Sequence, residues 1–376
     1  MIIKTIEIKD VANKILAAVD SNELSEVTET LQLKVMNETL YVSVTNREYY
    51  AQVKLTVGQG FDGFHSAVNA NLFLKLISQI TTESVDLTVK DTYMEVKGNG
   101  VYKLPLIFDN DKIMELPKID INNITTEMDV DAENLNSILQ YNSKQLNVGT
   151  ISKPIQKLYY LDDKGAVTFT TGACVNTFAL EKPINILLNN RLVKLFKLFK
   201  TGSVKLTLGY DAISDDVIQT KVKFESNDII LTAILSCDDT MLKAFPVNMV
   251  RGRAENIYPY SINLNKDAFL QTINRLLLFS SGFGAKEIIK PYATFNFTKD
   301  KVTVWDVRKE NCEDITYISC DSPNLDLYEA IFDLTDLKAT LESCTEQYLT
   351  MCFGDNAAMV IKRGTIANVI PQCRLG

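Results

Sequence analysis

Histidine is nearly absent from this chain, and its cysteines are not paired. The one histidine, His65, follows Gly63 and Phe64 in a predicted loop, and the seven cysteines are scattered without any Cys-x-x-Cys pair. A zinc site would have to be built mostly from carboxylates, which is not the ligand set that zinc prefers. We therefore expect no metal ion, and reduced thiols of the kind that cytosolic proteins keep.

The sequence also lacks the motifs of common enzymes. It has no glycine-rich phosphate loop, no G-x-S-x-G or H-E-x-x-H motif, and no histidine beside a serine or cysteine that could act as a base. The adjacent carboxylates Asp215–Asp216 and Asp238–Asp239 lie in polar, turn-like stretches, whereas acid–base catalysis needs a shielded site. These absences indicate a protein that is not an enzyme and needs no cofactor.

Long apolar runs and an excess of basic residues are absent as well. No run is long enough to span a bilayer, and the first residues, Met1 to Glu7, are interrupted by charges as no signal peptide would be. We expect a cytoplasmic protein. Lysine and arginine number 39 against 47 acidic residues, a net charge of −8. A protein that coats nucleic acid with its whole surface is basic, so any such contact here must be local.

One local concentration of positive charge does occur, in residues 190–200. Apolar residues with the spacing of a helix face alternate there with basic residues three apart, and no acidic residue interrupts them. The apolar positions are Leu192, Leu195, Phe196 and Phe199, and the basic ones are Arg191, Lys194, Lys197 and Lys200. The pattern predicts an amphipathic helix with a basic ridge on which a polyanion could lie, or a solvated helix face that carries ordinary surface charge.

A pattern of strands and helices recurs three times along the chain. A strand that leads into a helix, further strands, a second helix and closing strands start near residues 5, 127 and 260. Asn69 is a predicted N-cap for the second helix of the first copy. We predict an α+β protein made of three copies of one domain, each with mostly antiparallel sheet and two helices on one side. Turn residues and charge near 116–118 and 251–253 place the domains at 1–118, 119–252 and 253–376.

This threefold order resembles the bacterial DNA polymerase III β sliding clamp over essentially the whole chain. Residues 69–89 resemble the second helix and following strand of that family's first domain. Tyr159–Tyr160 resembles its Tyr-Tyr loop, Phe245–Pro246 its Phe-Pro step, and residues 369–375 its apolar, proline-containing C-terminal tail. The resemblance implies a head-to-tail homodimer, a ring of six domains whose helices line a hole around duplex DNA.

The resemblance gives the basic ridge a role. A ring that slides should be acidic outside and basic only within, because contacts to phosphate carry no sequence information. The implied DNA-facing residues are Lys14, Lys75, Tyr159, Tyr160, Arg191, Lys194, Lys197, Lys200 and Arg275. For each single lysine outside residues 191–200, an ordinary solvated side chain remains an equal alternative.

The family also has a hydrophobic pocket that takes short linear motifs of the replicative polymerase, the clamp loader and repair proteins. The resemblance places its walls at Gly172, Cys174, Val175, Asn176, Thr177, Pro246, Val247, Val369, Ile370, Pro371, Gln372 and Arg374. Where the family usually reads Thr-Asp-Gly-His-Arg-Leu, this chain has residues 172–177, and Gln372–Cys373 replaces a common single Met. This divergence suggests a phage or mobile-element clamp with partner peptides of its own. For Val175 and Ile370, simple core packing is an equal alternative.

A different function remains open from the residues alone. A basic amphipathic helix can also lie on an anionic membrane surface, so residues 190–200 could serve a peripheral membrane protein or an interaction scaffold. The helices predicted at the corresponding positions of the other copies, 72–80 and 337–344, are far less basic. That difference, and the need for Phe196 and Phe199 in a repeated core, favour the clamp without membrane contact.

Overall fold

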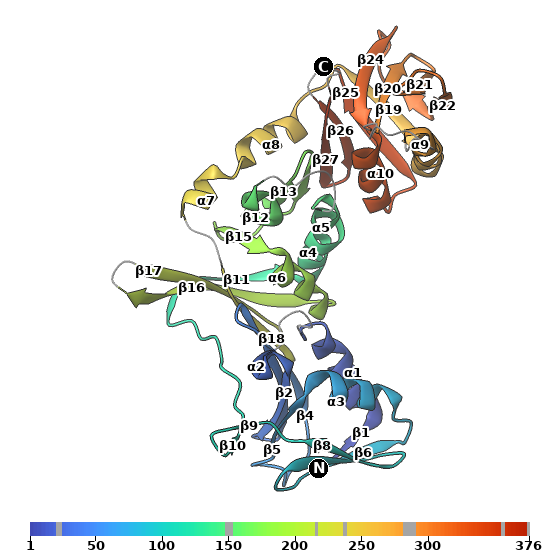
Figure 1. The fold of residues 1–376 in the computed structure, drawn as a ribbon. Helices are drawn as coiled ribbons and strands as arrows, with labels where there is room; N and C mark the ends of the chain where they lie inside the picture. The colour runs from blue at the N-terminus through green and yellow to red at the C-terminus, as the bar shows by residue number, and fades with distance from the viewer. Residues whose placement is uncertain are drawn as a thin grey trace. The chain divides into compact units, whose positions relative to one another are not determined.

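The computed structural model describes residues 1–19, 25–146, 153–214, 217–235, 239–280, 291–354 and 358–373 (Figure 1). Helices and antiparallel strands are mixed along the chain, which confirms the predicted α+β class. Within these ranges, no helix combines the length and the apolar character that crossing a membrane requires.

One order of elements occurs three times: a strand that runs into a helix, four strands, a second helix and three closing strands. The first copy comprises β1 (Ile2–Lys4), α1 (Thr5–Leu16), β2 (Thr30–Met36), β3 (Thr39–Thr45), β4 (Tyr49–Thr56), β5 (His65–Asn69), α3 (Ala70–Gln79), β6 (Ser84–Val89), β7 (Tyr93–Lys97) and β8 (Val101–Pro105). The second comprises β11 (Asn123–Asp131), a helical run of α4 (Ala132–Ser137), η1 (Ile138–Asn142) and α5 (Ser143–Gln145), then β12 (Leu158–Asp162), β13 (Gly165–Phe169), β14 (Ala173–Thr177), β15 (Asn185–Asn189), α6 (Asn190–Lys194) with η3 (Leu195–Leu198), β16 (Ser203–Ser214), β17 (Val217–Glu225) and β18 (Ile229–Ile234). The third comprises β19 (Tyr260–Asn265), α9 (Lys266–Ser280), β20 (Tyr292–Phe297), β21 (Lys301–Asp306), β22 (Cys312–Thr316), β24 (Tyr328–Asp333), α10 (Leu334–Ser343), β25 (Tyr348–Phe353), β26 (Ala358–Arg363) and β27 (Ile366–Pro371).

Shorter elements join or decorate these copies. They are α2 (Glu26–Glu29), β9 (Phe108–Asp109), β10 (Lys112–Ile113), η2 (Pro154–Lys157), α7 (Asp239–Ala244), α8 (Val247–Glu255) and β23 (Ser319–Cys320). The segment 251–253, expected as a turn, lies inside α8. Its one glycine, Gly252, is tolerated because the burial of Val250 and Ala254 against the sheet offsets the conformational cost of a glycine in a helix.

The second helix of every copy begins with the same cap. The last residue of the preceding strand accepts a hydrogen bond from a backbone N–H of the first helical turn, which that turn cannot satisfy internally. Asn69 accepts from Leu72 at 3.0 Å, Asn189 accepts from Leu192 at 2.8 Å, and Asp333 accepts from Thr335 at 2.7 Å. The predicted cap at Asn69 is confirmed, and the shared cap shows that the repeat extends to local chemistry.

Every copy builds two four-stranded arrangements in the same order. The first strand pairs with the strand after the second helix, giving β1-β6-β7-β8, β11-β16-β17-β18 and β19-β25-β26-β27. The four middle strands give β5-β2-β3-β4, β15-β12-β13-β14 and β24-β20-β21-β22. All of these pairings are antiparallel.

Two further pairings join neighbouring copies into continuous sheets. In the first junction, β4 pairs with β18 from Val53 opposite Ile229 to Tyr49 opposite Ala233. In the second junction, β14 pairs with β27 from Ala173 opposite Val369 to Asn176 opposite Ile366. In the sheet order, β4 and β14 are the edge strands of the middle arrangements of their copies. Both junctions therefore pair this edge strand with the final strand of the next copy, β18 or β27.

The chain divides into two compact units, residues 1–136 with 194–236, and residues 137–193 with 237–376. Each unit holds one junction, since the units follow the continuous sheets and divide the middle copy. In the first unit α1 packs against α3, and in the second α9 packs against α10 (Figure 1). The domain boundaries at 118 and 252 stay predictions.

The basic segment differs in form from the single helix that its spacing suggested. It begins as α6 and tightens into the 3₁₀ turn η3. Leu192, Leu195, Phe196 and Phe199 are all buried, as predicted, with Phe196 at 0% exposure against Phe224. A 3₁₀ helix has three residues per turn, so side chains three apart stand directly above one another. Lys194 is the N-cap of η3 and Lys197 lies within it, so these two side chains stand above one another, whereas Arg191 lies in α6 and Lys200 follows the turn.

Candidate nucleic-acid and peptide interfaces

The basic segment presents its charges to solvent while its apolar residues are buried. Lys194, Lys197 and Lys200 are exposed, and the two residues between each pair are buried. Arg191 is half-buried one turn earlier. Because the apolar side chains pack inward, the lysine ammonium groups are held on one short rigid ridge. This ridge is defined here as Lys194, Lys197 and Lys200, which belong to the first unit.

Lys14 lies beside this ridge, but its charge is already paired. Lys14, Lys197 and Lys200 line one surface cavity of about 400 Å³ in the first unit. The Lys14 ammonium binds Asp10 at 2.8 Å and Asp228 at 2.7 Å. Burial alone would lower the pKa of Lys14, but hydrogen bonds from its ammonium to the two carboxylates raise it above its ordinary value. Lys14 thus ties α1 to the β17–β18 turn, and the positive charge of the cavity comes from Lys197 and Lys200.

The other predicted cations have different surroundings. Lys75 is exposed on α3. Arg275 on α9 makes a two-pronged contact with Glu313, with its Nε and Nη2 each 2.6 Å from a carboxylate oxygen. This contact raises the pKa of Arg275 and lowers that of Glu313. Arg275 therefore offers little net charge to a phosphate.

The two tyrosines predicted to face DNA are core residues in this structure. Tyr159 is 0% exposed, and its hydroxyl contacts Ser143 Oγ and Asn190 Oδ1 at 2.9 Å each. Burial raises the pKa of Tyr159 to about 12. Tyr160 stacks on Phe245 with 5.1 Å between ring centroids. Alternate residues of β12 face the two sides of the sheet, and both sides are covered, so both rings are buried.

A mostly apolar surface cavity of about 330 Å³ opens beside the second junction. It lies between the β13–β14 turn, the end of β27 and helix α8. Its walls are Phe169, Thr170, Thr171, Gly172, Ala173, Met249, Val250, Arg253, Ala358, Val369 and Pro371. We call it the junction pocket. Its apolar lining with a few hydroxyls and one guanidinium suits a short peptide with apolar side chains.

Helix α8 forms one wall of the junction pocket, and two contacts hold it in place. Phe245, just before α8, packs on Tyr160 and, edge to face at 5.0 Å, on Phe169. Arg251 on α8 binds the Asp162 carboxylate through both terminal nitrogens, at 2.5 and 2.6 Å. Burial alone would lower the pKa of Arg251, but the contact with Asp162 raises it. Both partners are nearly buried, so this ion pair fixes the helix against β12.

Three of the predicted pocket residues, Gly172, Val369 and Pro371, line the junction pocket. Val175 and Val247 lie in the apolar cluster beneath it, and Pro246 is the N-cap of α8. Thr177 is exposed at the end of β14, and the Gln372 side chain accepts a hydrogen bond from the Tyr328 hydroxyl at 3.4 Å. Arg374 lies outside the described residues.

Three predicted pocket residues lie on the wrong face of the sheet. Cys174 and Asn176 alternate with Ala173 and Val175 along β14 and so point away from the pocket. Asn176 donates to Ser137 Oγ at 2.7 Å. Ile370 likewise belongs to the core of the third copy, whereas its neighbour Val369 faces the pocket cluster. An ungapped comparison of residues cannot separate the two faces, but the period of two in a strand could have done so.

Sequence reasoning missed the α8 wall of the pocket. Arg253 lies four residues after Met249 and three after Val250, so its side chain neighbours both on one side of that helix. Met249 is 64% exposed, an unusual position for a large apolar side chain. The turn expected at residues 251–253 concealed this face.

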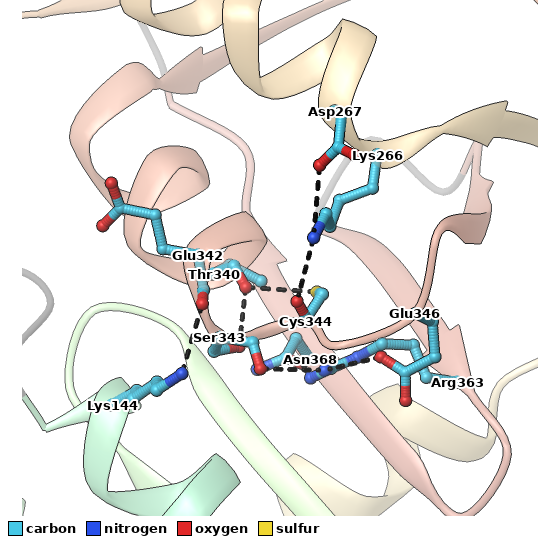
Figure 2. Close-up of polar contacts among 10 residues, drawn as sticks. All are labelled: Lys144, Lys266, Asp267, Thr340, Glu342, Ser343, Cys344, Glu346, Arg363 and Asn368. Atoms are coloured by element: carbon cyan, nitrogen blue, oxygen red, sulfur yellow. Dashed lines mark hydrogen bonds and ion pairs between the residues drawn. The ribbon is translucent and has the colours of Figure 1, made fainter.

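Three cations bind the C-terminal end of α10 (Figure 2). Lys144 of α5 donates to the Glu342 carbonyl at 3.2 Å, Arg363 of β26 to the Ser343 carbonyl at 3.4 Å, and Lys266 of α9 to the Cys344 carbonyl at 3.3 Å. These carbonyls have no partners within the helix and lie at the negative end of its dipole. Helix α10 is thereby anchored to three other elements.

Known structures share this fold along the whole chain, although no model of a known protein family and no curated protein matches the sequence. The DNA polymerase III subunit beta of Pseudomonas aeruginosa superimposes with a TM-score of 0.80 at 11% identity, covering 100% of both chains. The DNA polymerase sliding clamp of Bacillus subtilis gives 0.75 at 12%, covering 100% of this chain and 99% of that one. The Helicobacter pylori beta clamp bound to a DNA ligase peptide gives 0.71 at 16%, with the same coverage.

The architecture is thus the three-copy α+β fold of DNA clamps. More narrowly, it is the fold of the bacterial DNA polymerase III β sliding clamp, as the sequence resemblance predicted.

Proposed function

We propose that this protein is a DNA sliding clamp. Two copies would close head to tail into a ring around duplex DNA, and the junction pocket would tether a replicative polymerase and a clamp loader through short peptide motifs. The role is mechanical, so it calls for neither a catalytic residue nor a cofactor. The observation that carries the proposal is the full-length clamp fold together with two sheet edges that the repeated topology leaves open.

The open edges suit a second copy of the chain. Within the described residues, each junction pairs the edge strand of a middle arrangement (β4 or β14) with the final strand of the next copy (β18 or β27). The corresponding edge strand of the third copy, β22, and the final strand of the first copy, β8, have no such partner. A β22–β8 pairing between two copies would repeat the junction geometry twice more. Such a heterologous contact closes as a ring when the rotation allows it.

The lysine ridge is the part of the surface that supports DNA contact. Three exposed ammonium groups on an acidic chain attract phosphate locally while the remaining surface repels it. These contacts read no bases, so a bound ring could slide. The burial of Leu192, Phe196 and Phe199 disfavours the membrane alternative, because an interfacial helix must offer its apolar face to lipid.

A topological experiment tests the proposal. The protein is incubated at high concentration with a nicked plasmid and passed through a sizing column at 0.2 M salt, before and after the plasmid is cut once. A sliding ring remains on the circle and is lost from the linear form. Equal retention on both forms would show ordinary surface binding and would contradict the proposal.

A further inference from the structure

The turn that forms one rim of the junction pocket is held from behind by buried polar side chains. Residues 170–172 connect β13 to β14, and the Thr170 N–H donates to the Gly172 carbonyl at 2.7 Å. Gln145 Nε2 donates to Thr170 Oγ1 at 3.2 Å, and Gln156 Nε2 donates to the Thr170 carbonyl at 3.1 Å. Both glutamines are buried, so water competes little for these hydrogen bonds.

A third support comes from helix α10. The Thr171 hydroxyl donates to Asp336 Oδ2 at 2.7 Å. Asp336 is 7% exposed, and burial raises the pKa of its carboxyl. A buried carboxyl group needs a hydrogen-bond donor, and the Thr171 hydroxyl is the side-chain donor to Asp336 in this structure.

The position of the turn is narrowly defined. A Cβ at Gly172 would lie 2.8 Å from the Val369 carbonyl and 3.3 Å from Gln145 Nε2. The turn therefore packs directly on β27 and on Gln145, and a small displacement would narrow or open the pocket. The same two helices that reach the turn are tied to each other, because Lys144 of α5 binds the last turn of α10 (Figure 2).

We infer that Asp336 and Gln145 are positioning residues of the junction pocket. They hold the Thr170–Gly172 rim in its peptide-accepting place before a ligand arrives. This rests on the proposed peptide-binding function. Preorganisation raises affinity by reducing the ordering cost at binding, so the effect of losing these residues falls on peptide affinity more than on folding.

The variants Thr171→Val, Asp336→Leu and Asp336→Asn test this in the full-length protein. Val has the shape of Thr without the hydroxyl, and Asn keeps an oxygen that can accept from Thr171. Thr335→Val is the matched control, because Thr335 is an exposed threonine next to Asp336 that does not line the pocket. The probe is the tightest-binding peptide recovered by the wild-type protein from a random heptapeptide display library.

Two readouts separate the inference from the function on which it rests. Hydrogen exchange of the amides of residues 170–173 in the free protein reports the rim directly. Fluorescence anisotropy with the selected peptide reports affinity. We expect Thr171→Val and Asp336→Leu to speed exchange and to weaken the peptide about tenfold, with thermal unfolding nearly unchanged. Asp336→Asn and Thr335→Val should behave like the wild type in both.

Unchanged exchange in Thr171→Val, or an Asp336→Asn variant as weak as Asp336→Leu, would overturn the inference and leave the peptide pocket standing. If Thr171→Val speeds exchange but the peptide binds as before, the rim has no positioning role and the inference also fails. If the wild type recovers no peptide, the peptide pocket fails, and the positioning role fails with it whatever the exchange rates are.

Discussion

The two junctions are built by the same strand pairing but are covered by different kinds of chain. At the first junction, the covering segment is residues 114–122, which form neither helix nor strand and line a cavity on the sheet. The Lys221 ammonium donates to the Asp120 carbonyl at 2.8 Å, and the Asn122 N–H donates to Asp211 at 3.0 Å. The cavity there, about 290 Å³, is lined by hydroxyls, an amide and lysines as well as isoleucines. At the second junction, helix α8 covers the sheet and the cavity is mostly apolar.

The difference follows from where backbone hydrogen bonds go. A segment that forms neither helix nor strand cannot satisfy its own N–H and carbonyl groups, so it needs polar side chains around it. A helix satisfies its backbone internally and can therefore present Met249 and Val250 to an open pocket. The same topology thus gives a polar seam in one place and an apolar peptide pocket in the other. The segment that covers the junction, either residues 114–122 or helix α8, determines whether the cavity is polar or apolar.

The largest effect should come from removing the cation that holds the covering segment at each junction. This cation is Arg251 at the second junction, and at the first it is Lys221, which also pairs with Asp211. Arg251→Ala leaves the buried Asp162 carboxylate unpaired, and we expect the free energy of unfolding of the second unit to fall by about 3 kcal/mol. Peptide binding at the junction pocket should be lost as well. Lys221→Ala should lower the unfolding midpoint of the first unit and leave peptide affinity within about twofold. Denaturation followed by hydrogen exchange measures both.

The double variant Arg251→Ala/Asp162→Ala is the control, because it should recover part of the loss. Equal loss of peptide binding in both single variants would contradict the separation of the junctions.

A side chain at Gly172 should close the pocket without affecting the first junction. Because a Cβ there meets the Val369 carbonyl at 2.8 Å, Gly172→Val should weaken the selected peptide by at least about a hundredfold. Gly252→Ala on α8 is the matched control. A Cβ at Gly252 meets nothing within 4 Å, so alanine should leave affinity unchanged and stabilise the helix by about 0.5–1 kcal/mol. Anisotropy titrations decide, and near-wild-type binding by Gly172→Val would place the peptide elsewhere.

The lysine ridge should act independently of both junctions. Replacing Lys194, Lys197 and Lys200 with Gln should reduce the slope of log affinity for duplex DNA against log salt by about 2.7 per protomer, or about 5.4 for the proposed ring of two, since each phosphate contact contributes about 0.9. Peptide affinity should not change. The control replaces Lys90, Lys112 and Lys299, which are exposed lysines of other elements. A filter-binding salt series measures the slope, and equal slopes in the two triple variants would remove the ridge from the DNA interface.

The smallest expected effect is on the acid sensitivity of the two junctions, which should have opposite signs. Burial would raise the pKa of Asp228, but its contact with Lys14 lowers it. The stability it gives the first unit is present above the unfolded pKa and is lost as pH falls through the folded pKa. Burial raises the pKa of Asp336 in the second unit, so the cost of its charge disappears as pH falls through that raised value.

Hydrogen exchange of the two units, measured from about pH 5 down to about pH 2 and corrected for the intrinsic exchange rate, tests this sign. We expect protection to fall first near Asp228, and the variant Asp228→Asn to remove that pH dependence. Asp336→Asn should make the second unit slightly more stable at neutral pH. A second unit that loses protection before the first would contradict the assignment of the two signs.

The fold could be predicted from the sequence because its signals are local and repeated. Alternating strands, two helices per copy and the Asx caps before α3, α6 and α10 are written in neighbouring residues. The basic ridge was also visible, because Lys194, Lys197 and Lys200 stand three apart with buried residues between them. The 3₁₀ form of residues 195–198 was not predicted.

The details of the two interfaces could not be predicted because they depend on distant partners. Nothing local to Lys14 shows that Asp228 lies 2.7 Å away, and nothing local to Tyr159 shows that both sides of β12 are covered. The α8 wall was hidden because Arg251 and Gly252 resemble a turn until Asp162 binds the arginine. Asp336 enters the pocket rim only through the fold, which brings α10 to the β13–β14 turn.

The measurement that tests the central claim most directly is small-angle X-ray scattering on the purified protein, read together with its mass in solution. Ring closure through β8 and β22 predicts a particle of twice the 42.2 kDa chain mass with the scattering of a hollow disc. A monomer that persists at high concentration, or a solid particle of any mass, would contradict the ring and leave the clamp fold with another use.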